Sequence, residues 1–176
     1  MTKLRAKHLF LLEEIERSGG ESGGVRLCFE LLAVADAIDR DCAARLARHG
    51  LSEGRFVILS MLERATGALP PSVLAERAGV TKGTITGLLD GLEREGLARR
   101  VPDASDGRAL LVHATDRGAA LARKLLSEHT TWIAGLFAAL AESNAGTLSG
   151  LLNQVWAATD EGSASRPNGD RRTLNG

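Results

Sequence analysis

Apolar residues recur every three or four positions through most of the chain, and this spacing predicts a mainly α-helical protein. The first amphipathic stretch covers residues 3–17. It is followed by the glycine-rich segment 18–24, which predicts a flexible joint. A long second helix is expected over about 25–48, ended by Gly50. The first part of the chain therefore predicts two helices joined by a hinge.

Shorter elements follow the long helix. Ser52 is expected to cap a short helix, and Pro70-Pro71 starts the next one, because proline suits the first helical turn. Gly79 turns the chain, and Thr81 has a hydroxyl that can cap the following helix. Two helices joined by a glycine turn indicate a helix-turn-helix.

Two strand-like segments come next, residues 97–101 and 109–113, joined by the polar tip PDASDG. A hairpin in this place is a β-wing, and the whole arrangement is suited to setting its second helix into a DNA groove. The pattern therefore predicts a winged helix-turn-helix DNA-binding lobe over residues 51–114.

The helical pattern then returns. One stripe is expected from 116 to about 141, an interruption at Ser143-Asn144, and a last helix over 144–159. The polar residues 160–176 predict a disordered tail.

The terminal helices carry apolar stripes that are longer than one small lobe can cover. A second copy of the chain would cover them, which predicts a homodimer whose dimerisation region comprises residues 25–50 and 115–159, with 1–24 as an amino-terminal helix and joint. Such a dimer places two reading helices about one DNA turn apart and favours a pseudo-palindromic operator. A monomeric helical bundle is the alternative.

The charge balance limits how strongly the chain is expected to bind DNA. The chain has a formal net charge of zero, and residues 72–123 hold eight basic side chains against seven acidic ones. Because DNA affinity depends on phosphate neutralisation, this balance argues against strong non-specific binding. It leaves room for a winged helix that contacts only protein.

Other functional classes find little support. The four histidines are scattered, and we find no metal-spaced set, phosphate loop or nucleophile-base pair, so neither an enzyme nor a metal or cofactor is expected. Two cysteines are too few for a disulfide scaffold. No signal peptide and no long apolar run is visible, which predicts a cytoplasmic protein without a membrane segment.

The expected reading helix has an unusual polar face. Its apolar residues share one side, whereas Gly83, Gly87 and Gly91 are placed on the other. Each interior glycine costs roughly 0.5–1 kcal/mol of helix stability relative to alanine. Either the bare face allows close approach to DNA, or the glycines are tolerated gaps on an exposed surface. Both interpretations predict modest base readout by this helix.

Taken together, these segments resemble the MarR family of bacterial transcriptional regulators. The resemblance covers about residues 45–150 and is carried by GLSEGRFVILSML (50–62), LAERAGVTKGTITGLLDGLEREGLARR (74–100) and PDASDGRALLVHATDRGAAL (102–121). It implies an obligate homodimer and repression that is relieved by a small molecule or by oxidation. Pro70 stands where the family often has a capping Ser or Thr, so the third helix is expected to rely on Ser72.

The resemblance also implies a wing motif, Asp106-x-Arg108, whose arginine reaches the minor groove. A solvated tip with a weak ion pair is the alternative for these two residues. Arginines often seen in the reading helix are replaced by Gly87 and Gly91. The candidate DNA-binding residues are Ser72, Thr81, Lys82, Thr84, Thr86, Gly87, Arg99, Arg100, Asp106 and Arg108.

For the signal, the resemblance favours an apolar ligand pocket between the long helix and the winged lobe, with an aromatic carboxylate or phenol as effector. The candidate ligand-binding residues are Arg26, Cys28, Arg55, Phe56 and Leu59. Phe56 and Leu59 equally suit plain core positions, and Arg55 a surface ion pair. The segment RLCFELL (26–32) also resembles the peroxide-sensing branch, with Cys28 as the reactive thiol. The chain has no tyrosine to support a thiolate there, so a structural cysteine is the alternative.

Overall fold

A computed structural model describes residues 4–103 and 109–164, with side chains up to residue 159. The chain divides into two compact units, 1–129 and 130–176, which are described separately. The elements are α1 (Ala6–Arg17), α2 (Gly23–Ala47), α3 (Glu53–Arg64), α4 (Pro71–Ala78), α5 (Lys82–Arg94), β1 (Ala98–Pro102), β2 (Leu110–Ala114), α6 (Asp116–Phe137) and α7 (Glu142–Ala164). The mainly helical fold with a small sheet is confirmed.

The carboxyl-terminal boundaries differ from the sequence prediction. The break between α6 and α7 lies at 138–141, not at Ser143-Asn144. Glu142 lies in the first turn of α7, where its negative charge suits the positive end of the helix dipole. α7 also runs on to Ala164, so the predicted tail is wrong for 160–164, and the rest of that tail lies outside the described residues.

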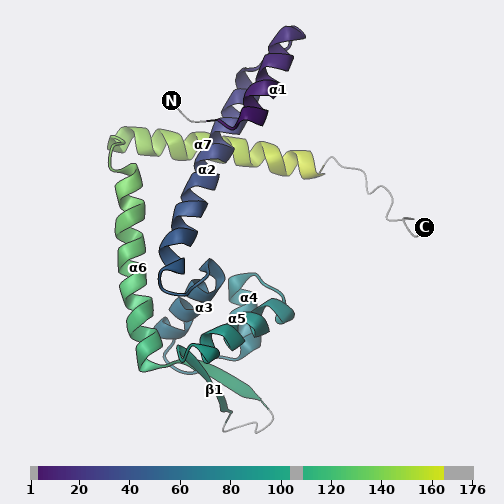
Figure 1. The fold of residues 1–176 in the computed structure, drawn as a ribbon. Coiled ribbons are helices and arrows are strands. Elements are labelled where there is room, and N and C mark those ends of the chain that lie inside the picture. Colours follow the sequence, from purple (N-terminus) through teal and green to yellow (C-terminus); the bar gives the residue numbers. More distant parts are fainter. Residues whose placement is uncertain (1–3, 104–108, 165–176) are drawn as a thin grey trace, which may run out of the picture. The chain divides into compact units, whose positions relative to one another are not determined.

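The first unit contains the winged lobe, formed by α3, α4, α5 and the two strands (Figure 1). Its core is aliphatic and includes Ile58, Leu59, Leu74, Ile85, Leu89, Leu92, Leu97 and Val112, each no more than 2% exposed. Ile85, Leu89 and Leu92 come from the face of α5 that the sequence predicts to be apolar. Burial of this face fixes which side of α5 is left for solvent.

The wing is a two-stranded antiparallel ladder. β1 and β2 pair in a register that sets Ala98 opposite Ala114 and Pro102 opposite Leu110. Leu69, just before α4, adds an isolated bridge to β2, since its N–H and carbonyl both bond to Val112 at 2.8 Å. The wing base is therefore tied to the start of the helix-turn-helix.

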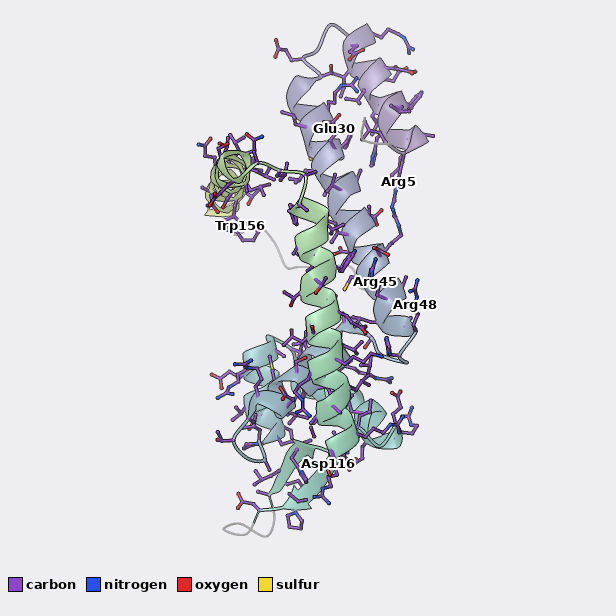
Figure 2. The ribbon with its side chains drawn as sticks, turned by 90° about the vertical axis from the view of Figure 1, so that its left-hand side faces the viewer. Arg5, Glu30, Arg45, Arg48, Asp116 and Trp156 are labelled. Carbon is purple, nitrogen blue, oxygen red and sulfur yellow. The ribbon has the colours of Figure 1, made fainter. Side chains whose placement is uncertain are left out.

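The amino-terminal helix folds back along α2. Arg5 donates to Asp36 at 2.5 Å, and the His8 ring stacks on Phe29 with centroids 4.3 Å apart. Figure 2 shows Arg5 reaching alongside α2. The Arg5 hydrogen bond, together with the charge of Arg40, holds the pKa of Asp36 below its ordinary value. These contacts fix α1 to α2 across the predicted joint.

The second unit holds the end of α6 and α7. Its large apolar side chains are mostly exposed, and Trp156 reaches 69%. A groove of about 330 Å³ lies between the two helices and is lined mainly by apolar side chains, including Phe137, Leu140, Leu148 and Leu152. Across the described residues, no helix is both long enough and apolar enough to cross a membrane.

Candidate DNA-binding surface

The helix-turn-helix is formed by α4 and α5. Pro71 is the first residue of α4, and Pro70 before it has an extended backbone; no side chain caps this helix. The expected capping by Ser72 is therefore wrong, because a proline at the first turn removes one of the amides that a cap would satisfy. Ser72 is exposed. Gly79 ends α4 with φ +64°, the left-handed conformation that glycine adopts without strain.

The start of α5 is exposed and well capped. The Thr81 hydroxyl accepts a hydrogen bond from the Thr84 amide at 3.2 Å, which confirms the predicted cap. Thr86 donates its hydroxyl to the Lys82 carbonyl at 2.9 Å, so its oxygen remains able to accept a bond from a ligand. The exposed residues of this stretch are Thr81, Lys82, Thr84, Thr86 and Gly87. The structure therefore gathers five of the predicted DNA contacts on one short stretch.

The glycines of α5 have two different environments. A Cβ built on Gly87 meets no atom of the described residues within 4 Å, and one on Gly83 meets only the Thr81 hydroxyl at 3.9 Å. Gly91 is buried instead, and its Cβ would lie 2.3 Å from the Arg55 guanidinium. The sequence prediction that Gly91 shares the exposed face is wrong, since four-residue steps rotate the position by about 40° each time around the helix.

Arg100 of the wing is bound to α5. Its guanidinium donates to Asp90 at 2.7 Å and to Glu93 at 2.5 Å, and its amide also donates to Glu93. The Asp90 hydrogen bond is the largest cause that raises the pKa of Arg100. The guanidinium thus compensates two carboxylates that would otherwise repel DNA phosphates.

Two further wing candidates differ in what the structure shows. Arg99 is exposed, and its Nε donates to His113 Nε2 at 2.6 Å across the ladder. Asp106 and Arg108 lie outside the described residues. The hairpin is closed at the base of its tip by a 2.9 Å bond from the Asp103 amide to the Ala109 carbonyl.

The five predicted ligand-binding residues do not meet within one chain. Arg26 and Cys28 lie in the first two turns of α2, whereas Leu46, near its other end, packs in the core with Phe56 and Leu59. At about 1.5 Å per residue, these ends are roughly 30 Å apart. Phe56 and Leu59 are core residues, 7% and 0% exposed.

The two arginines of that set have partners of their own. Arg55 donates to Glu95 at 2.9 Å, and Arg26 lies 3.8 Å from Glu16. Their positive charges are therefore already met by carboxylates of the same chain, which weakens the case for either as a carboxylate anchor.

A cleft that the sequence reasoning missed lies between the end of α2 and α6. It has a volume of about 80 Å³ and is lined by Arg45, Leu46, Arg48, His49, Leu125, Glu128 and His129. Figure 2 shows Arg45 on the last turn of α2 and Arg48 just beyond it, at the C-cap. His49 lies 3.9 Å from Glu128. The basic run RLARHG at 45–50 is the signal that could have indicated it.

The two cysteines are in different surroundings. Cys28 is exposed, contrary to the buried position expected for a structural thiol, and neighbouring Leu27 is 68% exposed. Cys42 packs against the core, and burial, followed by the charge of Glu53, raises the pKa of its thiol. Within the described ranges no three His, Cys, Asp or Glu side chains group as metal ligands do.

The lobe and its exposed reading helix define a winged helix-turn-helix DNA-binding protein, and comparisons with known proteins agree. A sequence model of the MarR family matches residues 49–109. The transcriptional repressor YetL of Bacillus subtilis is 36% identical over 117 residues, which cover 66% of this chain and 70% of YetL. The regulator PecS of Dickeya dadantii is 32% identical over 127 residues, covering 71% and 76%.

A solved structure has the same fold. FabT of Streptococcus pneumoniae, in complex with DNA, aligns with a TM-score of 0.64 at 19% identity and covers 77% of this chain and 96% of FabT. The chain therefore belongs to the MarR family of winged helix-turn-helix transcriptional regulators, which act by binding DNA and are not enzymes.

Proposed function

We propose that this regulator is a homodimeric repressor that binds a pseudo-palindromic operator and is released from it by a small-molecule ligand. Residues 51–114 form the DNA-binding lobe, and 25–50 with 115–159 the dimerisation region. The observation that carries the DNA-binding surface is the exposed start of α5, where Thr81, Lys82, Thr84 and Thr86 lie beside two glycines without side chains.

Exposed apolar surface supports the homodimer. Leu27, Leu31 and Leu32 of α2 are 68%, 43% and 54% exposed, and α7 exposes a second apolar set that includes Trp156. Apolar patches of this kind mark protein interfaces, and a symmetric dimer is the commonest assembly that buries them. Two copies would also supply the two reading helices that a pseudo-palindrome requires.

The DNA contacts we propose divide between helix and wing. Lys82, Arg99 and the wing motif Asp106-x-Arg108 supply charge, while Ser72 and the threonines of α5 donate or accept at phosphates and base edges. Arg100 contributes by holding Asp90 and Glu93, as its ion pairs support. Because part of the affinity comes from these cations, we expect it to fall as salt is raised, with a shallow slope set by their small number.

The α2–α6 cleft supports a carboxylate effector. Arg45, Arg48, His49 and His129 line it together with Glu128. Arg45 is already paired with Asp41 at 3.2 Å and His49 lies 3.9 Å from Glu128, so Arg48, which has no ion pair among the described residues, is the arginine best able to bind an aromatic acid. Its volume of about 80 Å³ is smaller than the roughly 300 Å³ of ordinary ligand pockets. A ligand must therefore bind a conformation in which this cleft is wider. That conformation would change the spacing between the two winged lobes of the dimer.

A gel shift on the DNA upstream of the gene, at about 50 mM salt and above, tests this function. Wild-type protein should bind, and a panel of benzoates and phenols should include compounds that release it. Replacing Thr84 and Thr86 by alanine should weaken binding. Ser18→Ala is the matched control, since its hydroxyl also donates to a backbone carbonyl about one turn back, at 2.8 Å, and it lies outside both the lobe and the proposed dimerisation region. Unchanged affinity and site preference in the α5 variant would reject the groove assignment.

Cys28 is exposed in the single chain and supports thiol-based sensing as a second candidate. This candidate requires that the proposed dimer leave the thiol accessible, although Leu31 and Leu32 share its face of α2. Treating wild-type protein and Cys28→Ser with an organic peroxide separates the two signals. Release of DNA only from the wild type would favour oxidation, whereas equal behaviour of both proteins rejects it.

A further inference from the structure

Arg55 of α3 occupies space that a side chain at position 91 of α5 would need. A Cβ on Gly91 would lie 2.3 Å from its Nη2, 2.4 Å from its Cζ and 2.4 Å from its Nε. Real Cβ atoms do not approach other atoms so closely, so a side chain at position 91 would displace the guanidinium, which is the far end of a flexible side chain. The glycine at position 91 is therefore what lets the guanidinium lie against the backbone of the reading helix.

The same guanidinium is also hydrogen-bonded to the end of α5. Arg55 Nη1 donates to the Glu95 carboxylate at 2.9 Å, and the side chains of Arg55 and Glu95 are 26% and 34% exposed. Glu95 is the C-cap residue of α5, one turn beyond Gly91. A planar guanidinium can lie flat against a backbone while it donates to a carboxylate, a geometry that a tetrahedral ammonium does not reproduce.

A second close contact lies one residue earlier on α3. A Cβ on Gly54 would lie 3.2 Å from Leu88 Cδ2. At two adjacent points, then, a glycine of one helix makes room for a side chain of the other. Side chains packed into such gaps resist sliding and rotation of the helix pair.

We propose that Arg55 is a positioning residue for DNA binding. It sets the angle of α5 against α3 and so aims the exposed start of the helix, without itself touching DNA or a ligand carboxylate. The inference rests on the proposed use of α5 as the reading helix.

The test measures operator affinity across a salt series, together with thermal stability, on the full-length protein. The operator is selected from a random DNA library, so that failure of the wild type to select any sequence would count against the proposed function and not against Arg55. Arg55→Gln should weaken binding by about tenfold, a typical size for losing one charged hydrogen bond and its packing. Its slope of log affinity against log salt should match that of the wild type.

The slope of log affinity against log salt distinguishes an arginine that positions α5 from one that contacts DNA. A phosphate-binding arginine removes about 0.9 from the slope when it is replaced, so a fall of that size would overturn the proposal. An unchanged affinity with a lower melting temperature would overturn it too, because Arg55 would then be merely structural. Arg64→Gln is the matched control: Arg64 is an exposed arginine of the same helix, without an ion pair among the described residues, and should keep its affinity.

Further variants distinguish a lost contact from a misfolded Arg55→Gln protein. Glu95→Gln keeps the side-chain shape and should weaken binding in the same direction, whereas Arg55→Lys should not restore it. Gly91→Ala should also weaken binding, but less so in an Arg55→Ala background, where the methyl group has room. Additive losses in that double variant would overturn the proposed contact.

Discussion

The carbonyl oxygen of Leu97 lies only 1.9 Å from where a Cβ on Gly118 would be. α6 therefore begins in direct contact with the backbone at the start of the wing. Thr115 strengthens the junction, because its amide bonds the Leu97 carbonyl at 3.0 Å and its hydroxyl caps the Gly118 amide at 3.1 Å. The wing and the helix that follows it are thus joined at one point that admits no side chain.

Gly118→Ala should destabilise the protein by about 3 kcal/mol, the upper end of ordinary overpacking costs, because the opposing atom is backbone and cannot rotate away. Urea unfolding followed by circular dichroism measures this. Gly87→Ala is the control: it lies in open space in the described structure and should gain about 0.5–1 kcal/mol from the better helix former. A neutral Gly118→Ala would mean that the junction yields easily.

The Thr81 cap should be worth about 1 kcal/mol, so Thr81→Ala should lower the free energy of unfolding by that amount. Thr81→Ser keeps the hydroxyl and should lose little. If both variants were equally unstable, the methyl group and not the hydrogen bond to the Thr84 amide would be responsible.

The link between wing and reading helix predicts a compensating pair. Arg100→Gln leaves Asp90 and Glu93 uncompensated, and we expect about 1 kcal/mol of lost stability for these partly exposed ion pairs. DNA affinity should also fall, because the freed carboxylates repel phosphates. Adding Asp90→Asn should recover part of the affinity. A double variant that binds no better than Arg100→Gln would indicate that Arg100 itself contacts DNA.

Local features of the lobe could be predicted from the sequence, whereas contacts between distant residues could not. Thr81 and Gly79 act within one or two turns of their own positions, so residue type suffices to assign a cap and a helix end. The Arg55–Glu95 bond spans 40 residues, and nothing in either segment alone indicates it. That contact also decided the environment of Gly91, which helical spacing had placed on the exposed face.

The candidate ligand residues show the same limit. The family resemblance predicts that Arg26 and Phe56 line one ligand pocket, because it implies a pocket between their helices. The length of α2 keeps them apart in one chain. The cleft that does form brings the end of α2 next to Leu125, Glu128 and His129 of α6, and no short motif records that packing.

The raised pKa of Cys42 predicts a pH effect with a defined sign. Because burial favours the neutral thiol in the folded state, its contribution to stability is fully present below the ordinary thiol pKa of about 8.5 and is lost as pH rises through the higher folded value. Iodoacetamide labelling of Cys28→Ser between about pH 7 and pH 10 should show a midpoint above that of unfolded protein. A midpoint at the unfolded value would contradict the burial.

Gly87 and Gly91 of α5 predict opposite outcomes for the same substitution. Gly87→Arg places a cation on the exposed face, where the described atoms leave space. It should fold, bind operator more tightly, and steepen the salt slope by about 0.9 if the guanidinium reaches one phosphate. Gly91→Arg must displace Arg55 and should lose both stability and affinity. Melting curves and a salt series on the two variants measure these effects, and Gly87→Glu, of opposite charge, should bind more weakly than wild type. An unchanged slope in Gly87→Arg would show that this face of α5 stays away from the DNA backbone.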